Sequence, residues 1–195
     1  MQTPTHLLVA AAVLAAPQAP RRNTALIAGA LLPDLSIYVL FAWSKIARIP
    51  ERQVWDVIYW QEPWQTLSAL SNSVPLWGLV LAMGMLVARS WRTAGILIVV
   101  TAVAALLHLA LDFPFHHDDA HKHFWPLTDW RFASPLSYWD PAHHGRSVAI
   151  AEVALAVGCV VVLWLRFASW RVRGILVGAL TAYVAVPLYF RLALG

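Results

Sequence analysis

Asp34 is the residue of this chain whose position most clearly calls for a chemical explanation. It lies at the centre of Thr24–Trp43, a stretch of twenty residues that otherwise carries no charge. A lone carboxylate at membrane depth costs about 2.5–3.5 kcal/mol, so such groups normally face a bundle interior, a cavity or a metal ion. We therefore expect Asp34 to belong to a polar site built inside a membrane protein.

His108 and Asp112 form the clearest local motif. Residues four positions apart share one face of a helix, so this imidazole and this carboxylate could bind one metal ion together. Pro114 then ends the helix and leaves Asp112 beside the following loop. The same spacing is also typical of a simple hydrogen bond between the two side chains.

The loop that begins at Phe113 supplies further potential ligands. Its candidate ligands are His116, His117 and His121. Neutral imidazoles combined with carboxylates suit Zn²⁺, Mn²⁺, Fe or Ni²⁺. Asp119 in this loop, or Glu152 further along the chain, could act as a general base. The alternative is a solvated polar loop whose histidines bind metals only adventitiously.

The composition of the chain indicates a membrane protein. Hydrophobic residues make up 60% of the sequence and charged residues only 12%, whereas a soluble domain carries about 25% charged residues. A length of 195 residues allows one compact bundle, so we expect a single transmembrane helical domain over residues 1–195. The single cysteine, Cys159, excludes an intramolecular disulfide.

Several segments are long and apolar enough to cross a bilayer, which takes about 20 residues. They are Thr24–Trp43, Ser71–Ala88, Thr93–Phe113, Ser147–Leu165 and Gly174–Leu194. The shorter Pro4–Ala16 could be a tilted sixth span or a helix that half enters the bilayer. No Lys or Arg precedes its apolar stretch, so we do not expect a cleaved signal peptide. We predict an all-α bundle of six transmembrane helices, with five as the alternative, and a His-rich extracytoplasmic loop.

The arginines predict how the bundle is oriented. The short connections around 21–22, 89–92 and 166–173 contain arginines and no acid, and the positive-inside rule places such loops in the cytoplasm. The long connections around 48–70 and 114–146 hold most of the acids and six of the eight histidines. In a bacterial inner membrane they would face outward. The net charge of +4 is therefore a topology signal and gives no basis for nucleic-acid binding.

The candidate residues lie at similar depths in their segments. His6 is near the outer end of the first segment, and Asp34 lies about 11 residues, or about 16 Å, from the inner end of the second. His108 and Asp112 fall in the outer third of their helix, and Glu152 is about one turn inside the next. We expect these residues to meet in one pocket that opens outward.

The chain also resembles a known family through four short motifs. In order they are Thr5–His6–Leu7, Leu31–Leu32–Pro33–Asp34, His108-x-x-x-Asp112 and Phe124–Trp125–Pro126–Leu127-x-x-Trp130–Arg131–Phe132. This pattern resembles the YdjM-like family of membrane-bound, metal-dependent hydrolases, known from LexA-regulated inner-membrane proteins. The resemblance implies a multi-helix inner-membrane protein. It also implies a metal site at His6, Asp34, His108 and Asp112.

One family element is different in this chain. The family usually carries Arg–Gly–x–Thr–His–Ser at the start of its middle helix, whereas the corresponding stretch here is Ser71–Asn72–Ser73–Val74 and has no histidine. Three interpretations stay open. Asn72 replaces the missing ligand, a loop histidine replaces it, or the metal site is altered or lost.

These features predict a membrane-embedded, metal-dependent hydrolase with an outward-facing site. A bound divalent metal, zinc first among the candidates, would lower the pKa of a water ligand towards about 7. A pocket at the outer leaflet favours a lipid-linked or phosphoester substrate drawn from the bilayer. The alternative is a non-catalytic membrane protein that binds or transports a metal ion. Transport would need polar residues in the inner half of the bundle, and the sequence has almost none below Asp34.

Overall fold

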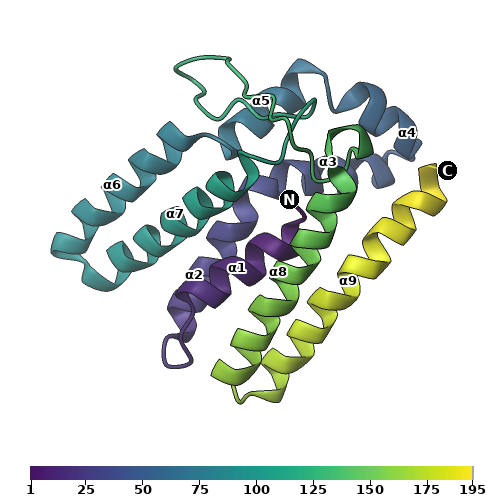
Figure 1. The fold of residues 1–195 in the computed structure, drawn as a ribbon. Coiled ribbons are helices and arrows are strands. Elements are labelled where there is room, and N and C mark those ends of the chain that lie inside the picture. The colour runs from purple at the N-terminus through teal and green to yellow at the C-terminus, as the bar shows by residue number, and fades with distance from the viewer. Residues whose placement is uncertain (195) are drawn as a thin grey trace.

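The computed structural model describes the backbone of residues 1–194 and leaves out the side chains at positions 187, 190, 191, 193 and 194. The described residues form helices and no strand (Figure 1). The α-helices are α1 (Thr3–Leu14), α2 (Pro20–Leu31), α3 (Leu35–Ile46), α4 (Glu51–Gln53), α5 (Glu62–Ser71), α6 (Val74–Ser90), α7 (Arg92–Asp112), α8 (Gly145–Arg166) and α9 (Trp170–Leu194). Two 3₁₀ turns, η1 (Leu32–Asp34) and η3 (Pro141–His143), and one π-helical turn, η2 (Val54–Ile58), complete the set.

Four stretches are long and apolar enough, by length and composition, to cross a membrane. They are Pro20–Ile46, Glu62–Ser90, Arg92–Asp112 and Gly145–Arg166. Three of them contain a predicted span and Arg92–Asp112 covers all but the last residue of Thr93–Phe113, so the prediction of an all-helical membrane bundle is confirmed in its coarse form. The 12 residues of α1 rise only about 18 Å, less than the hydrocarbon thickness of about 30 Å. The predicted span Gly174–Leu194 falls within α9, part of whose side chains lie outside the described residues.

Large apolar side chains cover the outer faces of the long helices. Leu79 on α6, Ile150 on α8 and Ile175 on α9 are 65%, 73% and 71% exposed. Soluble monomers rarely expose contiguous apolar patches of this kind. In a lipid environment these side chains meet hydrocarbon, which agrees with a membrane-spanning bundle.

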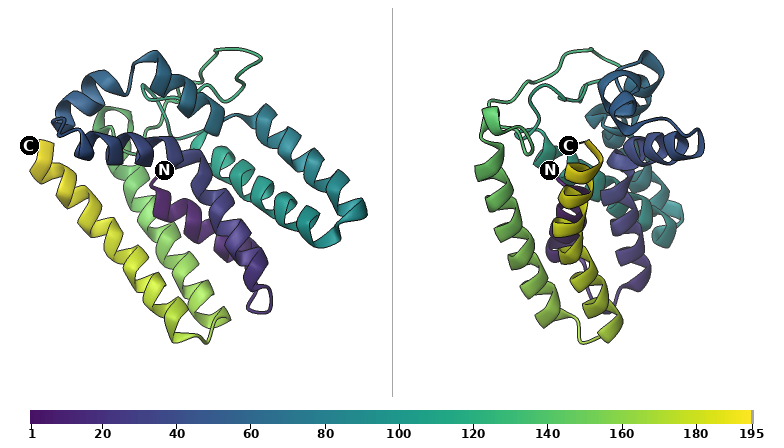
Figure 2. Two further views of the ribbon diagram at one scale, coloured as in Figure 1. Left: turned by 180° about the vertical axis from the view of Figure 1, so that it is seen from behind. Right: turned by 90° about the vertical axis from the view of Figure 1, so that its right-hand side faces the viewer.

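Pro33 interrupts the stretch Pro20–Ile46, as the sequence predicts. Proline has no N–H to donate, so the helix cannot continue regularly through it. The chain forms the 3₁₀ turn η1 at this point, and α3 then leaves at a steep angle to α2 (Figures 1 and 2). The carboxylate of Asp34 therefore lies at a bend, where its side chain is buried without belonging to a continuous helix face.

The two ends of the bundle are covered by different segments of the chain. Helices α3 to α5 and the long connection after α7 lie across the end that also holds the N-terminus (Figures 1 and 2). The connections α1–α2, α6–α7 and α8–α9, which are flanked by arginines in the adjoining helix turns, lie at the opposite end. This arrangement agrees with the predicted grouping of the arginine loops on one side and the long loops on the other.

A close approach of α2 and α7 brings the polar residues together. Gly29 on α2 faces the backbone of Thr101 on α7, and a Cβ atom at Gly29 would collide with the Thr101 carbonyl oxygen. The Thr101 hydroxyl also donates to the carbonyl of Ala25 at 3.1 Å. Beside this contact the buried residues Leu26 and Ala104 form part of an apolar cluster. The approach fixes α2 on α7, so that the turn after α2 reaches the last turns of α7.

Candidate metal centre

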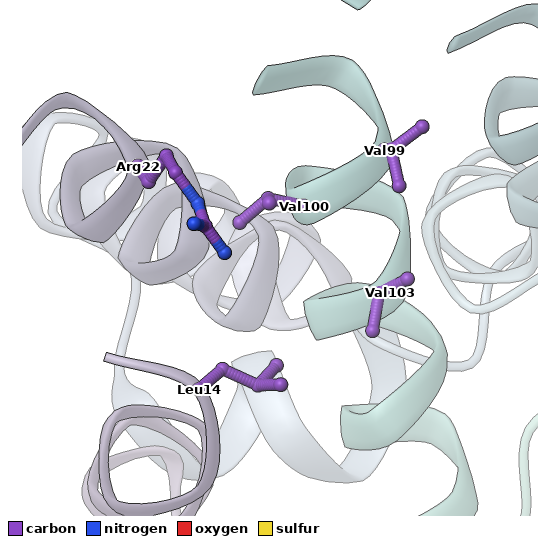
Figure 3. Close-up of a pocket in the computed structure, with 5 residues that line it drawn as sticks. All are labelled: Leu14, Arg22, Val99, Val100 and Val103. Carbon is purple, nitrogen blue, oxygen red and sulfur yellow. The ribbon is translucent and has the colours of Figure 1, made fainter. Parts of the chain in front are cut away.

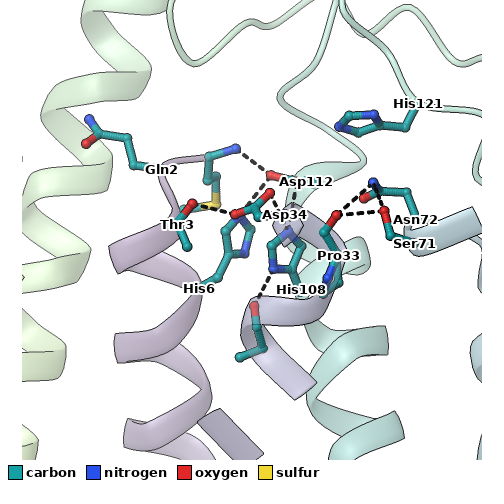
Figure 4. A network of polar contacts seen from close by, with 12 residues as sticks. Gln2, Thr3, His6, Pro33, Asp34, Ser71, Asn72, His108, Asp112 and His121 are labelled. Carbon is teal, nitrogen blue, oxygen red and sulfur yellow. Dashed lines mark hydrogen bonds and ion pairs between the residues drawn. The ribbon is translucent and has the colours of Figure 1, made fainter. Parts of the chain in front are cut away.

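The four helix-borne residues predicted as ligands converge at the covered end of the bundle (Figure 4). They are His6 on α1, Asp34 in η1, and His108 and Asp112 on α7. All four side chains are buried. His6 Nε2 lies 2.9 Å from Asp112 Oδ1, and His108 Nε2 lies 3.2 Å from Asp112 Oδ2. Helix packing therefore joins residues that are up to 106 positions apart in the sequence.

The orientation of His108 is set by the backbone of α2. Its Nδ1 lies 2.7 Å from the carbonyl oxygen of Ala30, and a carbonyl can only accept, so Nδ1 carries the proton. Its Nε2 faces two carboxylates, Asp112 Oδ2 at 3.2 Å and Asp34 Oδ1 at 3.5 Å. This placement needs a proton or a metal ion on Nε2. A histidine whose second nitrogen donates to a backbone carbonyl is typical of metal sites.

His6 packs flat against His108. The two ring centroids are 3.6 Å apart, and the ring planes differ by 11°. While Nε2 of His6 contacts Asp112, its Nδ1 is buried without a hydrogen-bond partner in the described structure. Buried polar atoms without a partner are uncommon and call for an explanation such as a bound ion.

A second group of ligands reaches the same carboxylate from the loop after α7. His116 Nε2 lies 3.3 Å from Asp112 Oδ1, and Asp112, His116 and His121 offer ligand atoms within 4.8 Å of one another. His116 Nδ1 lies 3.0 Å from Asp119 Oδ2, an ion-pair distance without the alignment of a hydrogen bond. His121 Nδ1 is 3.2 Å from the hydroxyl of Ser68 on α5. Both loop histidines are thus held by residues outside the group.

The two loop histidines differ in charge. Burial disfavours the charged form of His116, but Asp112 and Asp119 outweigh it and raise the pKa of this imidazole to about 9. Burial, together with the neighbouring charge of His116, lowers the pKa of His121 to about 3. At neutral pH His121 is therefore a neutral imidazole with a free lone pair, whereas His116 releases a proton when it binds a metal.

A positive charge already occupies the space between the two groups. The amino group of Met1 pairs with Asp112 Oδ1 and lies 3.4 Å from His116 Nε2. This ammonium contacts the same side chains that a metal cation would use, and so it stands in for one.

The donor atoms fit a divalent metal ion. In a tetrahedral zinc site with bonds of about 2.0–2.1 Å, neighbouring ligand atoms are about 3.3 Å apart. The contacts of His6, His108 and His116 with Asp112 measure 2.9, 3.2 and 3.3 Å. The only cysteine, Cys159, belongs to an apolar cluster between α1, α8 and α9. These buried groups could therefore hold a metal ion with nitrogen and oxygen ligands, as predicted.

Three other residues that were predicted for the site lie around these groups. His117 lies outside both groups, with Nδ1 2.6 Å from the Ser134 carbonyl oxygen and its ring stacked on His143. Asp119 is beside His116 and accepts a hydrogen bond from Trp139 Nε1 at 3.2 Å. Glu152 is buried on α8. Of the three, Asp119 touches a potential ligand directly.

Glu152 is next to the first residues of the chain. Its Oε1 accepts hydrogen bonds from the Gln2 amide at 2.6 Å and from the Thr5 hydroxyl, while Oε2 is buried without a partner. Because Met1 contacts Asp112 and Gln2 contacts Glu152, two consecutive residues connect the two carboxylates. Glu152 is thus close to the ligand groups but not part of either.

Asn72 belongs to the stretch at which the YdjM-like resemblance leads us to expect a histidine. Its side-chain amide donates to the carbonyl oxygens of Pro33 at 3.2 Å and Ser68 at 3.0 Å, and the Ser71 hydroxyl donates to the Pro33 carbonyl at 2.9 Å (Figure 4). These bonds hold the turn that carries Asp34. Asn72 therefore positions a site residue.

Three contributors to the site have no signal in the sequence that singles them out. The Ala30 carbonyl fixes His108, and the Ser68 hydroxyl fixes His121. His123 is buried with Nδ1 3.2 Å from the Asn72 carbonyl oxygen, and its ring lies beside that of His121. For His123 the position in a His-rich loop is a signal, but one that it shares with histidines outside the groups.

A cavity of about 640 Å³ borders Met1 and Glu152, two residues next to the ligand groups. Its lining includes Met1, Glu152 and mostly apolar side chains from α7, α8 and the connecting loop, among them Leu111, Phe115 and Val148. A smaller cavity of about 190 Å³, lined by Leu14, Arg22, Val99, Val100 and Val103, contains no carboxylate or imidazole (Figure 3). Only the larger of these two cavities therefore combines an apolar wall with residues, Met1 and Glu152, that lie next to the ligand groups.

Comparisons of this chain with protein-family models, curated proteins and solved structures found no match. The site is therefore described by its own geometry, and the YdjM-like resemblance stays a prediction from the motifs.

Proposed function

We propose that this protein is a membrane-embedded, metal-dependent hydrolase of the YdjM-like type. The main support is the environment of His108. Its Nδ1 donates to a backbone carbonyl, and its Nε2 faces the carboxylates of Asp34 and Asp112. Imidazoles held in this way, with carboxylates and a second buried histidine at hydrogen-bond distance, are the donor set of hydrolytic metal sites.

Each residue of the site has a role that follows from its contacts. His6, His108 and Asp112 hold the metal, and Asp34 balances its charge from the bend after α2. A bound divalent metal, with zinc the best fit to nitrogen and oxygen ligands, would lower the pKa of a water ligand towards about 7. Glu152 accepts the proton at Oε2, the oxygen that has no partner in the described structure.

The lining and the volume of the larger cavity support an amphipathic substrate. Leu111, Phe115 and Val148 provide an apolar wall for an acyl or isoprenoid chain, and Glu152 and Met1 mark the end next to the metal ligands. A volume of about 640 Å³ is within the usual range for small-molecule sites, about 300–1,000 Å³. A lipid-linked ester or phosphoester fits this combination.

The proposed setting is a bacterial inner membrane, with six helices and the site facing outward. The support is the contrast between the two ends of the helix bundle. The arginine-flanked connections lie at one end, opposite the covered end that holds the site. By the positive-inside rule, the arginine connections would be cytoplasmic. Substrate would then reach the site from the outer leaflet.

A non-catalytic metal-binding protein is the second candidate. The same ligand groups support binding without turnover. Transport across the membrane has less support, because the apolar cluster of Ala10, Leu26, Ala30 and Ala104 lies beside the ligands along α1, α2 and α7. An ion pathway would need polar groups in this position.

The two candidates are separated by Glu152→Gln. The full chain, purified in detergent and loaded with Zn²⁺, is assayed on amphiphilic phosphoesters and acyl esters. For a hydrolase we expect zinc-dependent turnover that falls at least about 100-fold in Glu152→Gln, because general-base catalysis contributes about 10²–10⁴-fold. Bound zinc should be unchanged. Zinc binding without turnover on any of these substrates would favour the binding protein.

A further inference from the structure

Asp112 belongs to two groups of potential metal ligands that share no other residue. The first contains His6 and His108, and the second contains His116 and His121. Its Oδ2 lies 3.2 Å from His108 Nε2, while its Oδ1 lies 2.9 Å from His6 Nε2 and 3.3 Å from His116 Nε2. Oδ1 is thus shared by the two groups, and a carboxylate that contacts imidazoles of both groups is placed to bridge two metal ions.

The side chains of the loop group are buried and held in place by neighbouring residues. His116 and His121 are only 6% and 5% exposed, unlike the histidines of a solvated loop. Asp119 lies beside Nδ1 of His116, and the Ser68 hydroxyl lies beside Nδ1 of His121. In both rings this leaves Nε2 as the potential ligand. Partners of this kind on the second nitrogen are typical of metal-binding histidines.

Carboxylates dominate the local charge. Three carboxylates, Asp34, Asp112 and Asp119, gather around the two groups. One divalent ion together with the Met1 ammonium would balance these three charges, and two divalent ions that displace the ammonium would exceed them by one positive charge. The Met1 ammonium beside Asp112 and His116 already supplies one positive charge at this place, where a second metal ion would replace it.

Building on the metal-dependent function proposed above, we propose that the protein binds two divalent metal ions. One is held by His6, His108 and Asp112, the other by Asp112, His116 and His121, and Asp112 is the ligand that both share. Paired metal ions are typical of phosphatases and nucleases, where they stabilise the attacking and leaving oxygens of a phosphoryl group. The second ion therefore favours a phosphoester over an acyl ester as the substrate class.

The test is a count of bound ions that does not depend on turnover. The full chain in detergent is stripped with a chelator, saturated with Zn²⁺, desalted and analysed by elemental mass spectrometry. We expect about two zinc ions per chain in the wild type. His121→Gln and His6→Gln should each retain one, since each disrupts one group. His117→Ala, the matched control from the same loop, should retain both.

A wild-type count of one at saturation would overturn the second ion, as would an equal loss in His117→Ala and His121→Gln. Loading with Mn²⁺ provides an independent check, since two ions that share a carboxylate give an exchange-coupled electron paramagnetic resonance spectrum. That coupling should disappear in His121→Gln while a single-ion signal remains, which also shows that the variant is folded. Uncoupled Mn²⁺ in the wild type would contradict the proposal. Two bound ions without turnover would refute only the hydrolase.

Discussion

The histidines on the helices and the histidines in the loop after α7 are held by different kinds of contact. His6 and His108 stack on each other between packed helices, and the backbone of α2 fixes His108. His116 and His121 depend on side chains, Asp119 and Ser68, that reach them from the loop and from α5. The helix-borne group thus depends on tertiary packing, and the loop-borne group on individual polar contacts. Substitutions should affect the two groups in correspondingly different ways.

Asp112→Asn should have the largest effect, because it removes the one residue that both groups share. An amide is a much weaker ligand than a carboxylate for divalent ions, and the change also removes the one carboxylate that all three neighbouring histidines contact. We expect the zinc content to fall to background, measured by elemental analysis after saturation and desalting. The control is Asp118→Asn, an exposed acid in the same loop, which should keep full occupancy. Substantial zinc in Asp112→Asn would mean that the groups do not meet at this residue.

Gly29→Ala should weaken the helix-borne group more than the loop-borne group, because the change acts through helix packing alone. The new Cβ would collide with the Thr101 carbonyl, so α2 must move away from α7. Overpacking of this kind costs about 1–3 kcal/mol. The matched control is Gly78→Ala on α6, where a Cβ meets nothing within 4 Å and where the exchange should stabilise the helix by about 0.5–1 kcal/mol.

Thermal unfolding in detergent should show a lower melting temperature for Gly29→Ala and a higher one for Gly78→Ala. Zinc titrations of Gly29→Ala should in addition show weaker binding at the group that contains His108, with the loop group less affected. Equal stability of the Gly29 and Gly78 variants would show that the α2–α7 approach is not as close as described.

Asn72→His should have the smallest effect on metal content, although it restores the residue that the family pattern predicts. The side-chain amide of Asn72 donates to the carbonyl oxygens of Pro33 and Ser68. We expect no gain in bound zinc and a loss of stability of about 1–3 kcal/mol, from two hydrogen bonds at about 0.5–1.5 kcal/mol each. Ser71→Ala, which loses its hydroxyl bond to the Pro33 carbonyl, should lose about half as much. A gain in zinc occupancy would place a ligand position at residue 72 after all.

The convergence of His6, Asp34, His108 and Asp112 could be predicted from the sequence, because depth in an apolar segment and i,i+4 spacing are properties of a helix that the sequence contains. Pro33 marked the bend beside Asp34 in the same way. The choice among the loop histidines could not be predicted, since it depends on α5. Ser68 selects His121, while His117 turns instead to the Ser134 carbonyl. The role of Asn72 could not be predicted either, because a motif resemblance does not reveal a hydrogen bond to the backbone of another segment.

The distance in sequence between His6 and Asp112 has a consequence for how the protein is made. The two residues touch in the folded chain but are separated by 106 positions. At a synthesis rate of about 5–20 residues per second, His6 leaves the ribosome about 5–20 s before Asp112. During that interval the nascent chain holds an imidazole and the Asp34 carboxylate without the aspartate that completes the group. On the proposed function, metal acquisition would therefore be a late event in biogenesis, after α7 has entered the membrane. A chain arrested before α7 would expose unpaired polar groups that membrane quality-control proteases could recognise.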